Sequence, residues 1–391
     1  MKKIFPYALP TTLLIGWFFY WSPLGMLWDL QVYSRAVTEF LLHQNPYLTG
    51  DISHKFPFVY HPVVLRFLVF IDYLIPLNLF LLTAYAVVIA FFMMQIYKTA
   101  STLRPENSIV KLNPLLIFLA SLSFGGAGTV ALMTGNLSIY MHMLLIASLL
   151  IACRSQSNLS NNISFMTIFL MAFIKPYFLA YLIILIFLSE FPRQLFIRAT
   201  VLSIFFGLIW TSTSYILSIE YQQFMVALNS LIEAGDIGYS FFGIMRNRVN
   251  IKSIEIAIFF HMAFATAILI GAGYIMLKLR KCKHTASRYQ ILFLLYFVCT
   301  IINPRMKEYD FFAAIFCLIV FICISKTNSL KIILPGFFIS QIPLFCFIID
   351  SWWGTAIKGD FANPISWQLY GLVLTGLIAI FSKPRLLKIA Q

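Results

Sequence analysis

The chain has 391 residues, of which 61% are hydrophobic and 17% are aromatic, while only 11% are charged. Its mean hydropathy of +0.87 lies far outside the range of soluble domains. The composition therefore excludes a soluble domain and predicts an integral membrane protein.

Apolar runs suited to membrane-spanning helices, which need roughly 20 residues each, recur along almost the whole chain. The first run, residues 4–28, lacks a small-residue cleavage site, so we interpret it as a retained first span rather than a signal peptide. We predict a single all-α polytopic domain over residues 1–391 with about twelve transmembrane helices. With the N-terminus in the cytoplasm, the spans fall near residues 7–28, 77–97, 111–124, 137–153, 163–175, 176–190, 198–218, 254–277, 289–303, 310–325, 331–349 and 367–382.

The distribution of charge supports this orientation. It places most of the 28 lysines and arginines on the cytoplasmic side, as the positive-inside rule requires. Among the 14 acidic residues, only Glu106 and Glu190 fall on that side. A net charge of +14 that is mostly cytoplasmic suits an anionic inner leaflet, so we expect a lipid bilayer and no nucleic acid as partner.

Polar residues gather on the predicted outer side, in a first loop over residues 29–61 and a second large loop over residues 219–253. Asn45-Pro46 is expected to end a helix that begins near residue 29. Residues 62–76 predict a second amphipathic or re-entrant helix. The first outer loop should therefore contain short amphipathic helices lying at the membrane surface.

The helix that begins near residue 29 has two distinct faces. Asp29, Tyr33 and Ala36 recur at i, i+4 and i+7, which places them on one face. Arg35 and Glu39 are spaced to form an ion pair on another.

Asp29 follows the first predicted span directly and therefore lies at the outer membrane boundary. A carboxylate at such a boundary is a candidate for chemistry. The alternative is that Asp29 only caps the helix, a position at which Asp is strongly favoured. Val32, three residues further on, cannot complete a capping box.

Several cations lie on the outer side, against the general trend of the charge. Lys175 stands between two apolar runs before a proline, where it alternatively anchors a helix end by snorkelling. Arg305 and Lys307 lie beside acidic residues, where a local ion-pair cluster is the alternative. Arg246 and Arg248 belong to the second outer loop. Together these cations suit an anionic ligand such as a phosphate.

Other motifs point away from nucleotides and metals. Gly135-Asn136 lies in a short outer connection, where glycine permits close approach of a substrate. The chain has no G-x-x-x-x-G-K sequence and no D-x-D, so we expect neither a nucleotide loop nor a metal-bound sugar nucleotide. The 6 cysteines contain no C-x-x-C pair, so neither a disulfide framework nor a zinc site is expected.

The order of these segments resembles the GT-C class of membrane glycosyltransferases, and most closely family 87, the polyprenol-phosphate-mannose-dependent mannosyltransferases. Members carry D-x-x-V-Y-x-x-A after the first span, then G-x-P-Y, F-x-Y-x-P, G-Q-x-N, K-P, and S-P before a polar-aromatic pair. The matching positions here are Asp29, Val32, Tyr33 and Ala36, then Asn45-Pro46-Tyr47, then Phe58, Tyr60 and Pro62, then Gly135-Asn136, Lys175-Pro176, and Asn303-Pro304 followed by Tyr309-Asp310. The usual turn glycine and the glutamine of the fourth motif are absent.

The resemblance implies an inverting transfer of a hexose, mannose or similar. The donor would be a polyprenyl-phosphate sugar and the acceptor a hydroxyl of a glycolipid or lipid-linked glycan, at the periplasmic face of a bacterial inner membrane. It implies a general base at Asp29 and no metal or cofactor. The donor-phosphate ligands would be Lys175, Arg305, Lys307, Arg246 and Arg248, and the sugar or acceptor ligands Tyr33, Tyr60, His61, Asn136 and Asp310.

Two other functions stay open. A lipid or solute transporter would place ionisable groups near the bilayer midplane and show repeat symmetry. A polysaccharide polymerase or ligase would use arginines in a large outer loop, and Arg246 and Arg248 are consistent with that.

Overall fold

The computed structural model describes residues 5–21, 25–47, 57–103, 113–155, 157–189, 191–233, 238–247, 249–281, 285–325, 329–354 and 364–381. Across these ranges the chain forms helices joined by turns and short irregular segments, and no strand occurs in them. The prediction of an all-α protein is therefore confirmed.

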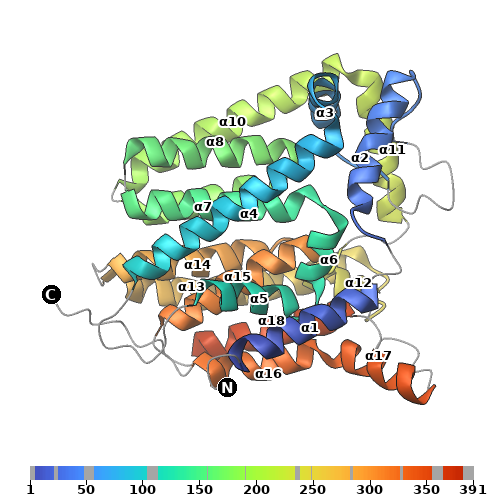
Figure 1. Cartoon of the computed structure of the whole chain (residues 1–391). Helices are drawn as coiled ribbons and strands as arrows, with labels where there is room; N and C mark the ends of the chain where they lie inside the picture. The colour runs from blue at the N-terminus through green and yellow to red at the C-terminus, as the bar shows by residue number, and fades with distance from the viewer. Residues whose placement is uncertain are drawn as a thin grey trace. The chain divides into compact units, whose positions relative to one another are not determined.

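The helices follow one another along the chain as shown in Figure 1. They are α1 (Phe5–Trp21), α2 (Trp28–Leu41), α3 (Pro62–Leu74), α4 (Leu77–Thr102), α5 (Pro114–Ser123), α6 (Ala127–Thr134), α7 (Leu137–Ser155), α8 (Asn158–Ile174), the 3-10 helix η2 (Pro176–Tyr181), α9 (Leu182–Leu188), α10 (Pro192–Ile216), α11 (Ser218–Glu233), α12 (Phe241–Asn247), α13 (Ile254–Lys281), α14 (Thr285–Ile301), α15 (Glu308–Ile324), α16 (Ser329–Ser340), α17 (Ile342–Trp353) and α18 (Pro364–Phe381).

Within the part of the chain that the structure describes, four helices are long and apolar enough to cross a membrane: α4, α7, α10 and α13. Two bent pairs, α5 with α6 and α16 with α17, raise the number to six if each pair is one span. The predicted number of about twelve is not confirmed. Several predicted spans correspond to shorter apolar helices such as α8 and α14, which have 17 residues each, at the lower end of the length that a span needs.

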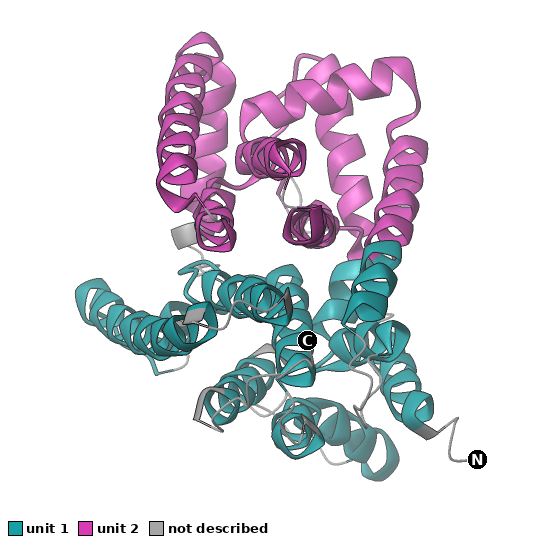
Figure 2. Cartoon of the chain, turned by 90° about the vertical axis from the view of Figure 1, so that its left-hand side faces the viewer, with its two compact units in different colours: residues 1–25, 93–133, 238–391 teal, residues 26–92, 134–237 magenta. Residues whose placement is uncertain are grey.

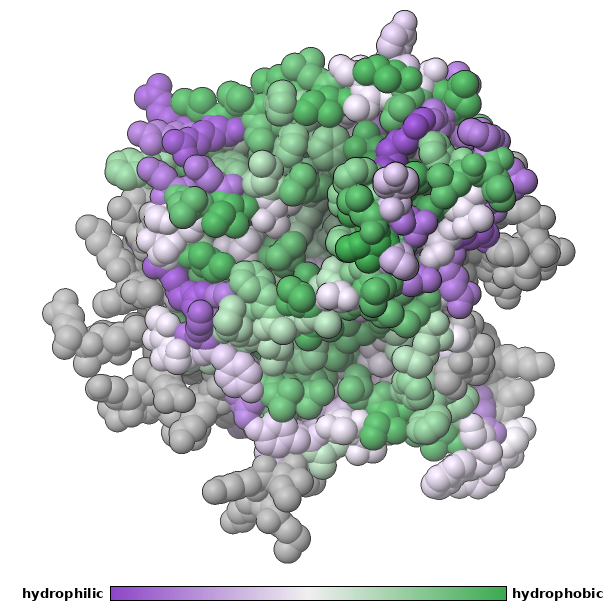
Figure 3. All heavy atoms as spheres, turned by 45° about the horizontal axis from the view of Figure 1, so that its top comes forward, coloured by the Kyte–Doolittle hydropathy of each residue, from purple (hydrophilic) through white to green (hydrophobic). Residues whose placement is uncertain are grey.

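Apolar side chains cover much of the face shown in Figure 3, as expected for helices that meet lipid. Along α10, the side chains of Val201, Ile204 and Leu208 are each about 60% exposed. Along α13, Phe259 and Ile270 are similarly exposed. Exposed apolar surface of this kind would be costly in water. The structure is thus consistent with a membrane protein.

The chain divides into two compact units (Figure 2). Unit 1 consists of residues 1–25, 93–133 and 238–391, and unit 2 of residues 26–92 and 134–237. The chain passes from one unit to the other within α4 and within α6. The single transmembrane domain remains a prediction.

In unit 1, α14 packs against α15 and α16 against α18. The last pair is very close, because a Cβ on Gly336 would lie 2.3 Å from the carbonyl oxygen of Gly371. The bends in α5–α6 and α16–α17 measure 92° and 45°. They are linked by Gln341, whose Nε2 donates to the carbonyl of Ser123 at 2.8 Å and whose Oε1 accepts from Trp17 at 2.9 Å.

In unit 2, α7 packs against α8, and α2 packs against α3. The buried face of α2 carries Leu30, Tyr33, Ala36 and Val37. This is the face predicted from the spacing of Tyr33 and Ala36. The helix ends at Leu41, earlier than the predicted stop.

Candidate functional site

A cluster of tyrosines, here called the tyrosine cluster, lies inside unit 2 and consists of Tyr33, Tyr60, Tyr85 and Tyr140. The hydroxyls of Tyr33 and Tyr60 are 3.2 Å apart. The rings of Tyr85 on α4 and Tyr140 on α7 stack with their centroids 3.7 Å apart. Burial raises the pKa of Tyr33, and neighbouring Tyr60 and Asp29 act in the same direction. Tyr33 therefore stays neutral and acts as a hydrogen-bonding group.

Asp29 is half-buried and lies in the first turn of α2, one turn before Tyr33. The residue that flanks the helix is Leu27, which adopts a left-handed conformation with φ 58° and provides no side-chain cap. The interpretation of Asp29 as an N-cap is therefore wrong. A carboxylate in the first turn still interacts favourably with the helix dipole.

The Gly135-Asn136 motif packs against this same turn of α2. Gly135 has φ +72°, and a Cβ there would lie 2.3 Å from a methyl of Leu30 and 3.3 Å from one of Leu27. Its carbonyl accepts a hydrogen bond from the Tyr85 hydroxyl at 2.7 Å. Asn136 directly precedes α7, and its Oδ1 accepts from the backbone N–H of Ser138 at 2.9 Å. The glycine is thus needed for close packing beside Asp29.

The tyrosine cluster also contacts the start of α7. The backbone N–H of Leu137 donates to the Tyr33 hydroxyl at 3.2 Å. Phe58 completes the aromatic surroundings, with its ring 5.2 Å from that of Tyr60. Of the predicted sugar or acceptor ligands, Tyr33, Tyr60 and Asn136 are therefore brought to one region of unit 2, together with Asp29.

His61 is directed to other contacts. Its Nδ1 accepts from the backbone N–H of Val63, and its Nε2 lies 3.3 Å from the hydroxyl of Ser214 on α10. The ring packs on Trp210 with centroids 3.8 Å apart. Burial lowers the pKa of His61 to about 4. His61 thus caps α3 and joins it to α10, and a role in sugar binding stays a prediction.

Lys175 separates α8 from η2 in unit 2, where its backbone is extended. The side chain is half-buried, and its Nζ lies 5.8 Å from the centre of the Tyr177 ring. The break predicted at Lys175-Pro176 is confirmed, while this position is compatible with both a snorkelling lysine and a phosphate ligand.

Residues 302–307 of unit 1, here called the polar loop, carry Arg305 and Lys307. The Oδ1 of Asn303 accepts from the backbone N–H of Arg305 at 3.0 Å. The loop leads into α15, where Asp310 is fully buried and its carboxylate accepts from the backbone N–H of Lys307 at 2.8 Å. Asp310 thus stabilises the start of α15, because its side chain pairs with the backbone N–H of the residue that precedes the helix.

Arg246 is occupied by its own loop in unit 1. Its Nη1 donates to the carbonyl of Ile251 at 3.1 Å and also to the carbonyl of Lys252. These bonds use the two N–H groups of Nη1, while Nε and Nη2 carry the other three guanidinium donors, so a role in closing on phosphate stays a prediction. Arg248 lies outside the described residues.

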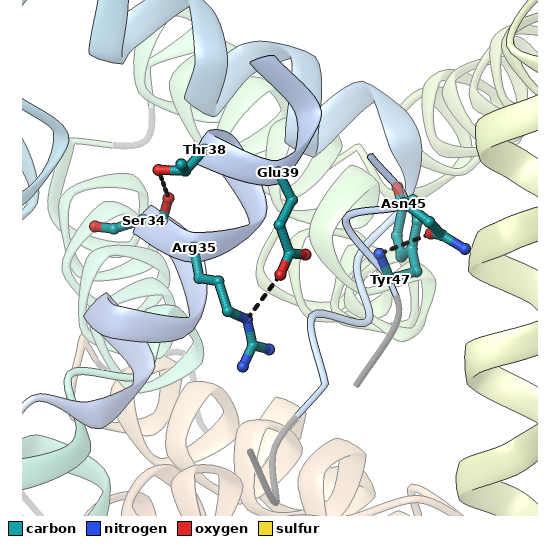
Figure 4. A network of polar contacts seen from close by, with 6 residues as sticks. All are labelled: Ser34, Arg35, Thr38, Glu39, Asn45 and Tyr47. Atoms are coloured by element: carbon teal, nitrogen blue, oxygen red, sulfur yellow. Dashed lines mark hydrogen bonds and ion pairs between the residues drawn. The ribbon is translucent and has the colours of Figure 1, made fainter. Parts of the chain in front are cut away.

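The predicted pair of Arg35 and Glu39 on α2 is confirmed, with the two charged groups 3.6 Å apart (Figure 4). Figure 4 also shows the bond from the Thr38 hydroxyl to the carbonyl of Ser34, at 3.0 Å. After the end of α2, Asn45 accepts from the backbone N–H of Tyr47 at 3.0 Å (Figure 4), a turn consistent with the predicted Asn-Pro stop.

Sequence reasoning missed Tyr85, Tyr140 and the ion pair between Arg66 and Glu220. The two tyrosines lie inside apolar runs predicted as spans, where a tyrosine gives no sign of a site. Arg66 joins α3 to α11 through Glu220 and lies over the ring of Phe40 at 4.6 Å.

Among the described residues, no group of three or more His, Cys, Asp or Glu could hold a metal ion. Comparison of the chain with protein-family models, with curated proteins and with solved structures gave no match.

Proposed function

We propose that the chain is an inverting hexosyltransferase of GT-C type that uses a polyprenyl-phosphate sugar as donor. The acceptor is a hydroxyl of a glycolipid or lipid-linked glycan at the outer face of a bacterial inner membrane. In this proposal the shorter apolar helices also cross the bilayer, which gives about twelve crossings. The apolar helices and the order of the sequence motifs support it.

The proposal rests on one structural observation. Motifs that are far apart in the sequence lie close together around the first turn of α2. Asp29 lies one turn from Tyr33, whose hydroxyl contacts Tyr60 and the start of α7. Gly135 packs on the same turn. A half-buried carboxylate beside neutral hydroxyl and amide groups has the character of a general base in a sugar-binding site.

The reaction needs a base and a means of stabilising the leaving phosphate. Asp29 takes the proton of the acceptor hydroxyl as the hydroxyl oxygen bonds to the anomeric carbon. The bond from that carbon to the phosphate oxygen breaks on the opposite face, and polyprenyl phosphate leaves. Lys175, in the same unit as Asp29, stabilises its negative charge, while the sequence-based assignment of Arg305 and Lys307 in unit 1 stays a prediction.

The proposal is tested by incubating the purified protein with a panel of defined polyprenyl-phosphate sugars and a membrane lipid extract as acceptor. We expect one donor to be consumed, with formation of polyprenyl phosphate and a glycolipid of inverted anomeric configuration. A panel in which no donor is consumed or bound contradicts the proposal. Mass spectrometry of the lipid fraction measures donor and product together.

A transporter is the second candidate, and the two bent helix pairs of unit 1 favour it. Discontinuous helices line the binding sites of many transporters, and here Gln341 links the two breaks. A transporter would move a labelled lipid-linked sugar between the leaflets of proteoliposomes without consuming it.

A further inference from the structure

The consecutive helices α2 and α3 of unit 2 expose opposite kinds of side chain. Between its ends, α2 exposes the polar residues Gln31 and Thr38. On α3, the side chains of Phe67, Phe70 and Leu74 are 54%, 58% and 57% exposed. They recur at i, i+3 and i+7, so they form one face of α3, and this face differs from the buried face that packs inside the unit. A face of large apolar side chains is favourable only in apolar surroundings.

The two charged residues of α3 are both paired within unit 2. Arg66 forms an ion pair with Glu220 on α11, and its guanidinium lies 4.6 Å from the centre of the Phe40 ring. The Oδ1 of Asp72 accepts from the backbone N–H of Leu77 at 2.9 Å, just where α4 begins. Charged side chains at a membrane boundary are usually paired in this way. The charges of α3 are therefore compatible with an apolar environment around its exposed face.

The beginning of α3 is fixed beside the last two turns of α10. His61, which precedes α3, packs its ring on Trp210 with centroids 3.8 Å apart, and its Nε2 lies 3.3 Å from the Ser214 hydroxyl. At about 1.5 Å per residue, Trp210 lies roughly 9 Å from the end of α10 at Ile216. Because α10 is long and apolar enough to cross a membrane, α3 begins near the level at which that span reaches the bilayer boundary.

The exposed apolar surface of α10 extends to the same level. It includes Val201 and Leu208 and continues to Tyr215 and Ile216, which are 85% and 74% exposed. Residues 199–216 cover roughly 27 Å as a helix, close to the ~30 Å thickness of the hydrocarbon core. Lipid that surrounds α10 over this length therefore also reaches α3.

The orientation of α3 agrees with a position along the membrane surface. In Figure 1, α10 runs across the view, whereas α3 is seen end-on, so the two helices cross within unit 2. With 13 residues, α3 is roughly 20 Å long and too short to cross the hydrocarbon core. A short helix that crosses a span near its end lies in the plane of the bilayer.

We infer that α3 is an interfacial helix whose Phe67, Phe70 and Leu74 lie among the acyl chains of one leaflet, while the exposed face of α2 meets water. Under the predicted orientation this is the outer leaflet. The partner of this surface is thus the lipid itself, and the inference does not depend on sugar transfer. Because α2 packs against α3, the docking of α3 also sets the depth of α2, and with it Asp29, near the lipid headgroups.

The test measures the environment of a spin label on each helix. Phe70→Cys and the matched control Thr38→Cys are labelled in a full-length, cysteine-free protein and reconstituted in vesicles of phosphatidylethanolamine and phosphatidylglycerol. Collision of the label with oxygen, which concentrates among acyl chains, is compared with collision with a water-soluble nickel chelate. We expect oxygen to dominate at position 70, at a depth of about 5–10 Å below the lipid phosphates. At position 38 the nickel chelate should dominate.

Phe67→Cys is the second variant should Phe70→Cys fail to fold, and it should give the same result because it lies on the same face. Strong collision with the nickel chelate at these positions would mean that the face meets water. Weak collision with both reagents would mean that protein covers it, and dipolar coupling between labels would identify that protein as a second copy of the chain. Each of these results overturns the inference, and none of them bears on the proposed sugar transfer.

Discussion

Gly135 shows how space around a single residue determines its identity. Its φ of +72° disfavours a side chain, and a Cβ would collide with Leu30. We predict that Gly135→Ala lowers stability by roughly 2 kcal/mol or more, measured as thermal unfolding in detergent. Gly273→Ala is the control, because Gly273 has nothing within 4 Å, and it should be neutral or slightly stabilising. Equal effects of the two substitutions would contradict this reading.

His61 makes stability depend on pH in a defined direction. Its pKa is about 4 in the folded chain and about 6.5 when unfolded. Between these values the unfolded state binds more protons, so stability falls as the pH is lowered, by up to about 1.4 kcal/mol per pH unit. His61→Asn keeps a good N-cap residue but cannot titrate, so the melting temperature of this variant should fall less between pH 7 and pH 5. A parallel decline in both proteins would contradict the assignment.

At the scale of helices, the two breaks in unit 1 depend on one amide. Gln341 bonds Trp17 and Ser123, whereas neither amide atom of buried Gln368 has a partner within the described ranges. Gln341→Leu should cost about 2–4 kcal/mol, because it leaves buried polar groups unpaired. Gln368→Leu should be neutral or stabilising, because it removes polar atoms that are already unpaired. Thermal unfolding compares the two, and greater loss in Gln368→Leu would contradict the prediction.

The sequence predicted helices better than it predicted how they end and bend. Apolar runs located the long helices α4, α7, α10 and α13, because length and hydropathy are properties of a segment alone. The bend between α16 and α17 lies inside one predicted span. The sequence did not predict it, because hydropathy gives no information on the direction of a helix axis. Pro343, which follows that bend, was the available signal.

The candidate site was predictable where a residue stands out from its surroundings. Asp29 and Gly135-Asn136 interrupt apolar sequence, and the structure brings them to the same turn. Tyr85 and Tyr140 could not be found this way, because a tyrosine in an apolar run looks like ordinary core. The place of these two tyrosines in the candidate site depends on their stacking contact between α4 and α7, which forms only in the folded chain.

At the scale of the whole molecule, the uneven distribution of charge predicts which ends of the helices face the cytoplasm. Gln44 and Lys98 are exposed and flank the predicted second span on opposite sides. In a cysteine-free background, Gln44→Cys should react with a membrane-impermeant maleimide in spheroplasts. Lys98→Cys should react only after the membrane is permeabilised. The reverse pattern would place the candidate site on the cytoplasmic side.

The central claim is that Asp29 is the base of a sugar transfer, and one comparison tests it most directly. Asp29→Asn and Glu39→Gln each neutralise a half-buried carboxylate on α2, and Glu39 is already paired with Arg35. The measurement is the rate of donor consumption by each purified variant, together with its donor affinity. We predict that Asp29→Asn loses at least 100-fold in rate and still binds donor, while Glu39→Gln stays close to wild type. Near-normal transfer by folded Asp29→Asn would contradict the account.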